Sequence, residues 1–508
     1  MHSLIELPAK HSHASIPSHL LTLPAGLVRI SVGAEDVLDL MQDLSQAIRG
    51  ADRGRPLASH CLGSPLPHDE PSHACGTALP NWADVVGYEE GESRVHNLLR
   101  FGYPRFVYTP AVKHLMEHLP AMLGLAAGMA VMPMPSARAA LRLHKFLQLE
   151  GGAAAASVAL HDLQSRGVCA VSYPSALAPQ AKVFWQHTGD YVSSRLATRV
   201  LQDLTTDAGD LPAPNVAHAG SAVDGAKALL RRRIGQLVNS DAADVSLFGT
   251  GMGAMSGMCR AVQHATTMGR TGKFVVFGFP YLDTLKQLQH RHLGPGAHFV
   301  RQNDFAALDA ILQKESIAGL VLEYPSNPLL STSDMARVRQ RADEHGFPVI
   351  VDDSIGAYNV DVLRPGGADV LVTSLTKSFS GRGNVMGGAL VLNRTSAHYT
   401  RLRKAIAMGH EEELLFAEDA EVLLSNSMDF EYRTDRTNRS ADALAEFLVA
   451  HPAVARVDYP KYVTPDYYAA FMRDGQSGHG GLMSVILKDV GKAPAVYDAL
   501  QVREAGTP

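Results

Sequence analysis

Lys377 is the residue whose surroundings in this sequence most clearly predict chemistry. It lies in the segment LVTSLTKSFSGRGNVMGG, between an apolar run and a glycine-rich loop. An ordinary lysine stays on a solvated surface, because burying an unpaired ammonium group is costly. A lysine that follows an apolar strand and adjoins two hydroxyl side chains, here Ser374 and Thr376, is typical of a reactive amine.

Two other features would complement such a lysine. Asp352 follows the apolar residues 349–351 and precedes Lys377 by 25 residues. The glycine-rich turn at 249–253 follows the apolar residues 245–248 and opens a predicted helix, whose backbone N–H groups can bind phosphate. Pyridoxal phosphate requires this combination: a lysine for the Schiff base, a carboxylate for the pyridine nitrogen and an anion site. We therefore expect pyridoxal phosphate as the cofactor.

A parallel sheet must position these residues, since each of them follows a short apolar segment. Strands alternate with helices from residue 220 to about 398, the pattern of strand–helix–strand crossovers. Ligands of such sheets bind at the carboxyl ends of strands, so Tyr281 and the segment 323–328 also belong to the expected site. The predicted strands are residues 245–248, 274–277, 319–322, 349–351, 370–373 and 389–392.

Residues 186–508 resemble the Cys/Met-metabolism, or transsulfuration, family of pyridoxal-phosphate enzymes. The resemblance is carried by Asp-Val-Leu-Val-Thr-Ser-Leu-Thr-Lys at 369–377 and Asn-Val-Met-Gly-Gly at 384–388. It implies an α/β protein of fold type I, like aspartate aminotransferase. In that fold a large domain with a mixed, mostly parallel sheet is joined to a smaller α+β C-terminal domain.

The resemblance also implies roles for single residues. Lys377 would bond to the cofactor and carry protons, and Asp352 would contact its pyridine nitrogen. Tyr281 would stack on the ring and assist catalysis, and Asn327 would contact the phenolic oxygen. The remaining cofactor contacts, to the phosphate, would come from Gly251, Met252, Ser374 and Thr376.

Residues 78–200 are similar to the fungal type of cystathionine γ-synthase, which carries an N-terminal extension. Relatives have a Tyr-x-Arg motif that reaches the phosphate in the neighbouring subunit. This chain keeps Arg195 as a cofactor contact but has Ser193 in place of the tyrosine. Tyr103-Pro104-Arg105 could be a second copy of the motif, because the downstream PMPSARAA loosely echoes GTGMGAM.

The two ends of the chain depart from the family pattern. Residues 3–50 resemble the segment with which the family normally finishes, so the order looks permuted. They could complete the small domain, they could be a remnant of a fused gene, or they could form a surface helix unrelated to catalysis. If they complete the small domain, Arg29 is the arginine that binds the substrate α-carboxylate.

The expected domain division follows from these observations. It comprises the tail-like segment 1–50, a linker at 51–77, the N-terminal extension at 78–185, the cofactor-binding large domain at 186–398 and a truncated small domain at 399–508. Under the completion hypothesis, a helix at 35–48 buries Leu38, Met41 and Leu44 against a strand at 482–487. Arg433, Arg436 and Arg439 are expected on a solvated helix face.

The activity implied is γ-replacement, in which an activated homoserine ester and cysteine give L-cystathionine. Alternatives are a γ-lyase, a thiol-adding relative from secondary metabolism, or an inactive partner of an intact paralogue. The resemblance also implies a homodimer or homotetramer with shared active sites.

Composition excludes several other classes of protein. The 508 residues carry 46 Lys plus Arg and 51 Asp plus Glu, a net charge of −5 without long blocks of one sign, which argues against a nucleic-acid or polybasic membrane partner. Four scattered cysteines suggest a reducing compartment, and we expect a cytoplasmic protein. No metal is expected at the pairs His11/His13 and His290/His292, because no further ligands are suitably spaced.

Overall fold

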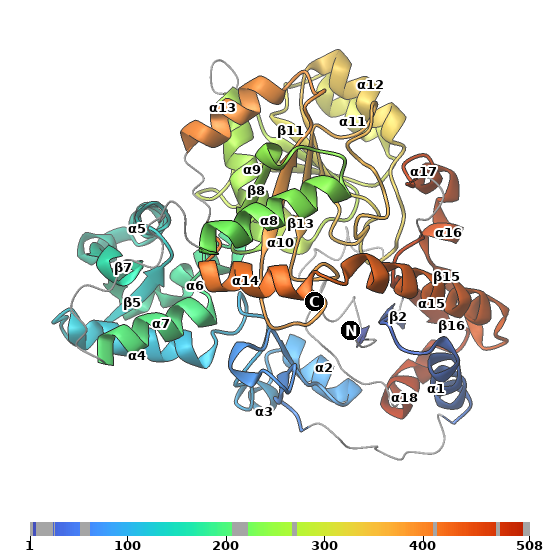
Figure 1. The fold of residues 1–508 in the computed structure, drawn as a ribbon, viewed down its shortest axis with the longest axis horizontal. Coiled ribbons are helices and arrows are strands. Elements are labelled where there is room, and N and C mark those ends of the chain that lie inside the picture. The colour runs from blue at the N-terminus through green and yellow to red at the C-terminus, as the bar shows by residue number, and fades with distance from the viewer. Residues whose placement is uncertain are drawn as a thin grey trace.

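A seven-stranded sheet forms the centre of the computed structural model (Figure 1). The structure describes residues 4–6, 24, 26–50, 61–205, 222–266, 272–409, 414–473 and 478–500. Neighbouring strands from β10 to β13 are parallel, whereas β14 is antiparallel to β13 and β8. In spatial order the strands are β10 (Ala297–Val300), β9 (Phe274–Phe277), β11 (Gly319–Glu323), β12 (Val349–Asp352), β13 (Val370–Ser374), β14 (Gly388–Leu392) and β8 (Val245–Phe248). The mixed, mostly parallel sheet predicted from the sequence is confirmed.

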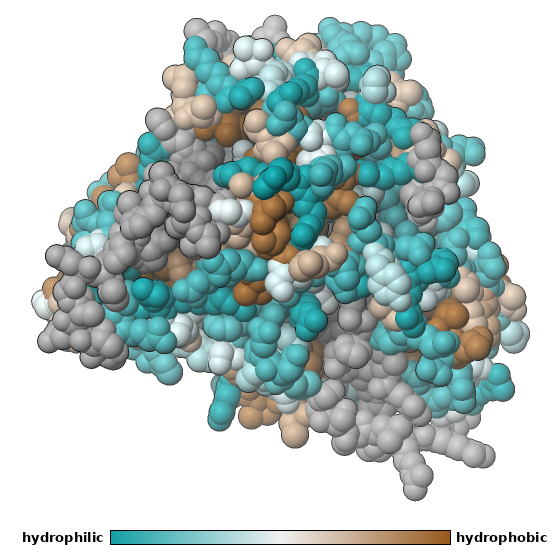
Figure 2. Space-filling view, viewed as in Figure 1, coloured by the Kyte–Doolittle hydropathy of each residue, from teal (hydrophilic) through white to brown (hydrophobic). Residues whose placement is uncertain are grey.

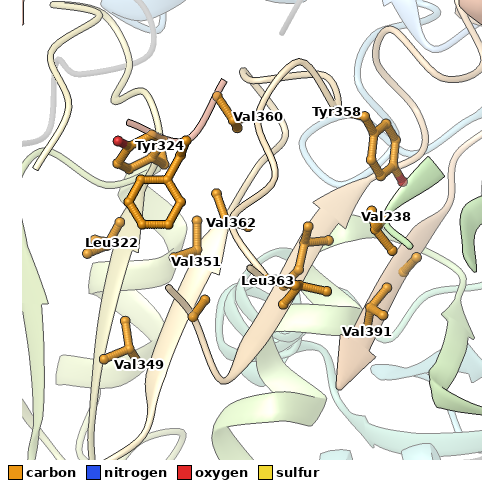
Figure 3. Close-up of a cluster of buried hydrophobic side chains, with 14 of the residues drawn as sticks. Val238, Leu322, Tyr324, Val349, Val351, Tyr358, Val360, Val362, Leu363 and Val391 are labelled. Atoms are coloured by element: carbon orange, nitrogen blue, oxygen red, sulfur yellow. The ribbon is translucent and has the colours of Figure 1, made fainter. Parts of the chain in front are cut away.

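Both faces of this sheet are buried, which is why its strands read as continuous apolar runs. Val349 and Val351 pack on one face and Ile350 on the other. Figure 3 shows Val349 and Val351 together with Leu322 in the hydrophobic core on the first of these faces. That face is covered by α8 (Ala222–Leu237), α11 (Phe305–Leu312), α12 (Met335–His345) and α14 (Ala417–Asn426). The opposite face is covered by α9 (Gly251–Thr266), α10 (Leu282–Gln289) and α13 (Tyr399–Gly409).

A second unit, formed by residues 110–205, lies beside the large domain (Figure 1). Its antiparallel sheet has the order β5 (Met129–Met134), β7 (Val168–Pro174) and β6 (Ala159–Leu163). Its helices are α4 (Pro110–Met122), α5 (Ala137–Glu150), α6 (Ala178–Thr188) and α7 (Ser194–Thr205). Gly189, directly after α6, approaches the turn before α9 so closely that a Cβ atom there would lie 2.3 Å from Thr250 Oγ1. This unit therefore abuts the predicted anion turn.

The small domain is built from both ends of the chain. Its sheet has the order β1 (Leu4–Glu6), β2 (Leu27–Ser31), β16 (Leu482–Leu487) and β15 (Val454–Asp458), all antiparallel. In the register of β2 and β16, Arg29 lies opposite Ser484. Helices α1 (Val37–Arg49), α15 (Phe430–Ala450) and α18 (Ala493–Ala499) pack around this sheet, and short α16 (Pro460–Val463) and α17 (Pro465–Ala469) follow β15. The segment 27–49 is thus an integral part of this domain's core.

The packing of α1 differs from the expectation in detail. Leu44 is buried and Met41 is partly buried in the same core, but Leu38 is 69% exposed. The buried stripe runs through Leu40, Leu44 and Ala47, at the i, i+4, i+7 spacing of one helix face, and Leu38 lies off that stripe. Helix α1 packs against α15 and α18, and its buried Leu44 lies in the same core as Met483 and Val485 of β16.

Residues 61–77, which fall within the expected linker, form an ordered strap. Strands β3 (Pro65–Leu66) and β4 (Gly76–Thr77) pair in an antiparallel ladder. The Cys75 amide donates to the carbonyl of Gly383, 2.8 Å away, and so joins the strap to the loop after Lys377. Helices α2 (Trp82–Glu89) and α3 (Ser93–His96) follow. Periodicity did not reveal this segment because its two strands are only two residues long.

The visible surface is mostly hydrophilic, with small separate apolar patches (Figure 2). Among the helices that the structure describes, none has both the length and the apolar run needed to cross a membrane.

Candidate active site

A cavity of about 580 Å³ opens at the carboxyl ends of β11, β12 and β13. Strand β2 and the strap 61–77 supply further walls, so segments from the start and the middle of the chain meet there. The predicted site residues that line the cavity are Arg29, Gly251, Met252, Tyr281, Asn327, Asp352, Ser374, Thr376 and Lys377. Of the predicted set, only Arg195 does not line it.

Lys377 follows β13 at the floor of the cavity. Burial, together with the nearby charges of Arg29 and Arg105, lowers the pKa of its amine to about 7. Its Nζ atom lies 4.6 Å from the centroid of the Tyr103 ring. A substantial fraction of the amine is therefore neutral near pH 7, as a general base requires.

Asp352 ends β12 and is buried beside a second carboxyl group, Glu323. Its Oδ1 atom accepts a hydrogen bond from the Ser354 amide at 2.9 Å. Burial raises the pKa of Asp352, and burial together with Asp352 raises that of Glu323 well above its ordinary value. A cationic group in contact with Asp352 would stabilise its anionic form, so this position suits a protonated ring nitrogen.

The N-terminus of α9 lies against the end of β13, where the predicted phosphate contacts come together. A Cβ atom at Gly251 would lie 2.9 Å from that of Ser374, so only glycine allows the turn to approach this strand end. The Ser374 hydroxyl is buried and has no hydrogen-bond partner among the described residues. Helix N-terminal amides and a free hydroxyl are suitable donors to a phosphate. The Thr376 hydroxyl, by contrast, exchanges hydrogen bonds with the backbone of Gly387 at 3.1 and 3.3 Å.

Arg105 is a cavity residue that only the repeated motif indicated. It is 1% exposed, and its guanidinium donates to Asp283 at 2.8 Å and to the Tyr281 hydroxyl at 2.5 Å. Although burial opposes ionisation, Arg105 and His187 hold the pKa of Asp283 at about 2. The Arg105 Nε atom is buried without a partner in the described part of the chain.

Arg195 does not line the cavity of its own chain, and its predicted contact to the phosphate in a neighbouring subunit stays a prediction. Its guanidinium donates to the Asn384 carbonyl at 2.9 Å and to Asp419 at 3.1 Å, and it lies 3.5 Å from Glu70. These partners already satisfy the charge within the chain. The alternative copy of the motif, Tyr103-Pro104-Arg105, is the one at the cavity.

Arg29 reaches the cavity from β2. Its Nη1 atom donates to Asn327 Oδ1 at 2.9 Å. Burial lowers its pKa to about 10, while Glu323 opposes that shift, so the guanidinium stays protonated at neutral pH. Glu323 in turn accepts hydrogen bonds from the amides of Tyr281 and Asn327. The arrangement offers a fixed cation to a carboxylate ligand.

Sequence reasoning missed Cys75 and Glu70, which line the cavity from the strap 61–77. No signal in the sequence distinguishes them from a linker. Burial raises the pKa of Cys75 to about 12, so its thiol is neutral and is no candidate nucleophile. All four cysteines are free thiols.

The pair His290 and His292 does not contribute to this site. His290 and His292 lie 4.0 and 3.4 Å from Glu150, away from the cavity lining. Within the residues that the structure describes, no group of ligands could hold a metal ion. His11 and His13 lie outside those residues.

The partly buried lysine, the carboxyl group and the free donors near the N-terminus of α9, at the ends of a mostly parallel sheet, fit a pyridoxal-phosphate enzyme of fold type I. The family described as "Cys/Met metabolism PLP-dependent enzyme" matches residues 1–49 and 225–506. "Fungal trans-sulfuration enzyme, N-terminal domain" matches residues 111–193. The chain belongs to the Cys/Met-metabolism family of pyridoxal-phosphate enzymes.

Individual relatives span nearly the whole chain. The cystathionine γ-synthase of Neurospora crassa is 31% identical, over 87% of this chain and 88% of that protein. An alanine racemase of Aspergillus violaceofuscus is 32% identical, over 87% of each chain. The crystal structure of cystathionine γ-synthase from Xanthomonas oryzae pv. oryzae is 24% identical, covers 55% of this chain and 73% of that one, and has a TM-score of 0.45.

Proposed function

We propose that this protein catalyses γ-replacement on an activated homoserine ester, with cysteine as the nucleophile and L-cystathionine as the product. The observation that carries the proposal is that Lys377 and Arg29 line one cavity. A base and a carboxylate-binding cation together suit an amino-acid substrate. The similarity to the Neurospora enzyme supports this reaction.

The residues of the cavity have separate tasks in this proposal. Arg29 binds the substrate α-carboxylate and fixes the Cα–H bond toward Lys377. The neutral Lys377 amine would take the Cα proton and then a Cβ proton, which lets the γ-acyl group leave as the free acid. After the thiolate adds at Cγ, protons return to Cβ and Cα. Pyridoxal phosphate, when bound, supplies the electron sink that makes these protons acidic.

Other side chains hold the cofactor. Asp352 would pair with its ring nitrogen, while Ser374 and the amides at Gly251 and Met252 would bind its phosphate. Tyr281 would cover the ring, and its hydroxyl is oriented by Arg105. Asn327 would contact the ring oxygen from the position in which it accepts from Arg29. This full set of groups supports an enzyme over an inactive partner of a paralogue.

Elimination or another reaction on the same intermediates is the second candidate. The relative from Aspergillus violaceofuscus, an alanine racemase, favours it, because a racemase also moves an α-proton. A γ-lyase or a thiol-adding enzyme of secondary metabolism needs the same Lys377 and Arg29. The nature of the added thiol separates these reactions from cystathionine synthesis.

Product analysis tests the proposal. The purified holoenzyme is supplied with O-acetylhomoserine, O-succinylhomoserine or phosphohomoserine, each with and without cysteine, and the products are identified by mass spectrometry. We expect cystathionine only when cysteine is present, and none from Lys377→Ala. Formation of 2-oxobutanoate and ammonia regardless of cysteine would favour the lyase. In a parallel reaction supplied with L-alanine, racemisation of the alanine, together with neither product from the homoserine esters, would favour the racemase-like candidate.

We also propose a cytoplasmic setting and a homodimer or homotetramer. The four free thiols are compatible with a reducing compartment. Light scattering of the holoenzyme at several concentrations tests the oligomeric state.

A further inference from the structure

Two arginines of α15 form the same kind of ion pair in very different surroundings. Arg433 pairs with Asp429 at 2.8 Å and Arg439 with Asp435 at 2.7 Å, each four residues apart. The Arg439 side chain is 71% exposed, whereas that of Arg433 is 11% exposed. The expectation of a solvated arginine face is therefore wrong for Arg433.

The buried guanidinium of Arg433 binds the loop that directly follows Lys377. It donates to the carbonyls of Ser378 at 2.8 Å and Phe379 at 3.0 Å, with a longer contact to Ser380 at 3.4 Å. It also donates to the Asn426 carbonyl at 3.1 Å. Several buried carbonyl groups thus depend on one side chain, and an unsatisfied buried carbonyl costs about 1–3 kcal/mol.

The loop itself is a tight turn that begins at Lys377. The Gly381 amide donates to the Lys377 carbonyl at 2.8 Å, and the Ser380 amide donates to the Leu375 carbonyl at 3.0 Å. Gly381 has a φ of +70°, and a Cβ atom there would lie 2.1 Å from Arg433 Nη1. The turn and the guanidinium therefore fit one another closely, and displacing either would move the backbone of Lys377.

We propose that Arg433 is a positioning residue that fixes the backbone of Lys377 through the carbonyls of residues 378–380. This inference rests on the proposed function, in which Lys377 carries protons. Lysine cannot replace arginine here, because an ammonium group is a point donor and cannot reach several separated carbonyls as a planar guanidinium does.

The test follows bond formation between Lys377 and added pyridoxal phosphate in the apoprotein. The visible absorbance band of the lysine-bound cofactor gives the rate at each pH, and borohydride reduction followed by peptide mass spectrometry identifies the lysine. The variants are Arg433→Lys and Arg433→Met, and the matched control is Arg439→Met on the same helix. Thermal unfolding of each apoprotein reports whether the fold is intact.

We expect both Arg433 variants to slow bond formation at pH 7 about tenfold or more. The midpoint of the pH–rate profile should move upward, because a loosened loop admits water around the amine. Arg439→Met should stay within about twofold of the parent at every pH. A merely structural role would lower the melting temperature of the Arg433 variants and leave the pH midpoint unchanged.

A folded Arg433→Lys protein with the parent rate and midpoint would overturn the proposal. If Arg433→Met does not fold, Arg433→Lys and Asp429→Asn decide the matter, since the Asp429 side chain is 62% exposed and its loss loosens only the guanidinium. An unchanged midpoint of the pH–rate profile in both Arg433→Lys and Asp429→Asn would also overturn the proposal. Failure of the proposed function is distinguishable, because it would show as wrong products from the parent while the Arg433 effect persisted.

Discussion

Arg105 ends a Tyr-x-Arg sequence and Arg195 a Ser-x-Arg sequence, and their surroundings differ in charge. Arg195 lies near two carboxylates, Asp419 and Glu70. Among the described residues Arg105 has one carboxylate partner, Asp283, which also accepts hydrogen bonds from Gln186 and His187. Both arginines are buried, but only Arg105 lines the cavity.

The charge balance explains which copy can bind an anion. Lys182 lies near both Arg105 and Lys113, whose charges help to lower its pKa. The Arg105 guanidinium itself has one carboxylate partner among the described residues, Asp283, so it retains charge to offer a phosphate. Around Arg195 the chain already supplies the anions. A three-residue motif does not by itself define a phosphate site. The carboxylates near the arginine determine whether its charge is available to a phosphate.

The largest expected effect concerns whether one chain contains the whole site. Lys377 and Arg105 line the same cavity, so Lys377→Ala chains mixed and refolded with Arg105→Met chains should recover no activity above either variant alone. Mixtures of each variant with the parent serve as controls. Recovered activity would mean that Arg105 serves the active site of another chain.

The second prediction compares Arg105 and Arg195 directly. Arg105→Met should weaken pyridoxal phosphate binding by about 100-fold, because truncating one partner of a buried charge pair costs about 2–5 kcal/mol. Arg195→Met should leave that affinity within about threefold, but it should lower the melting temperature by exposing Asp419 to an uncompensated burial cost. Cofactor titration and thermal unfolding measure the two effects. Pyridoxal, which lacks the phosphate, should bind the parent and Arg105→Met alike.

A third arginine, Arg29, should affect binding of the substrate but not binding of the cofactor. Arg29→Ala should raise KM for the homoserine ester about 30-fold, since a hydrogen bond to a charged group contributes about 1.5–3 kcal/mol. Pyridoxal phosphate affinity should stay close to that of the parent. An unchanged KM in an active Arg29→Ala enzyme would place the carboxylate site elsewhere.

The smallest effect lies beside Arg105, at Lys182. Burial, with Arg105 and Lys113 nearby, lowers the pKa of this lysine to about 7, and its Nζ atom has no hydrogen-bond partner among the described residues. The unfolded chain holds the proton up to about pH 10.4. Lys182 therefore destabilises the fold fully below about pH 7, and the cost fades as the pH rises from about 7 toward about 10.4.

Lys182→Met should accordingly stabilise the protein by about 2 kcal/mol at pH 6.5 and by less at pH 9.5. Thermal unfolding at the two pH values measures this difference. Equal stabilisation at both would contradict the electrostatic explanation.

The predictions from sequence succeeded where burial left a clear pattern. The six predicted strands of the large sheet are continuous apolar runs, and each is present within one residue of its expected bounds. Lys377 was recognisable because a lysine after such a run is rare. Strand β10 was not predicted, since its residues Ala297, His298 and Phe299 are only partly buried at the sheet edge.

The features that the sequence did not predict depend on contacts between distant segments. The position of Arg433 is set by the carbonyls of residues 378–380, which no local pattern reveals. The strap 61–77 is held by the loop around Gly383, some 300 residues later. The exposure of Leu38 could not be predicted, because the elements that pack against a helix determine which of its faces is buried.

The pairing of β2 with β16 determines when the sheet of the small domain can form during translation. Ile30 leaves the ribosome about 450 residues before Met483, its neighbour in the sheet. At about 5–20 residues per second, that interval lasts about 20–90 s. During that interval β1 can pair with one edge of β2 as a local hairpin. The other edge of β2 and the apolar face of α1 remain without their native partners. An unpaired edge invites association with other nascent chains. Newly made protein should therefore depend on chaperones until its last strand emerges.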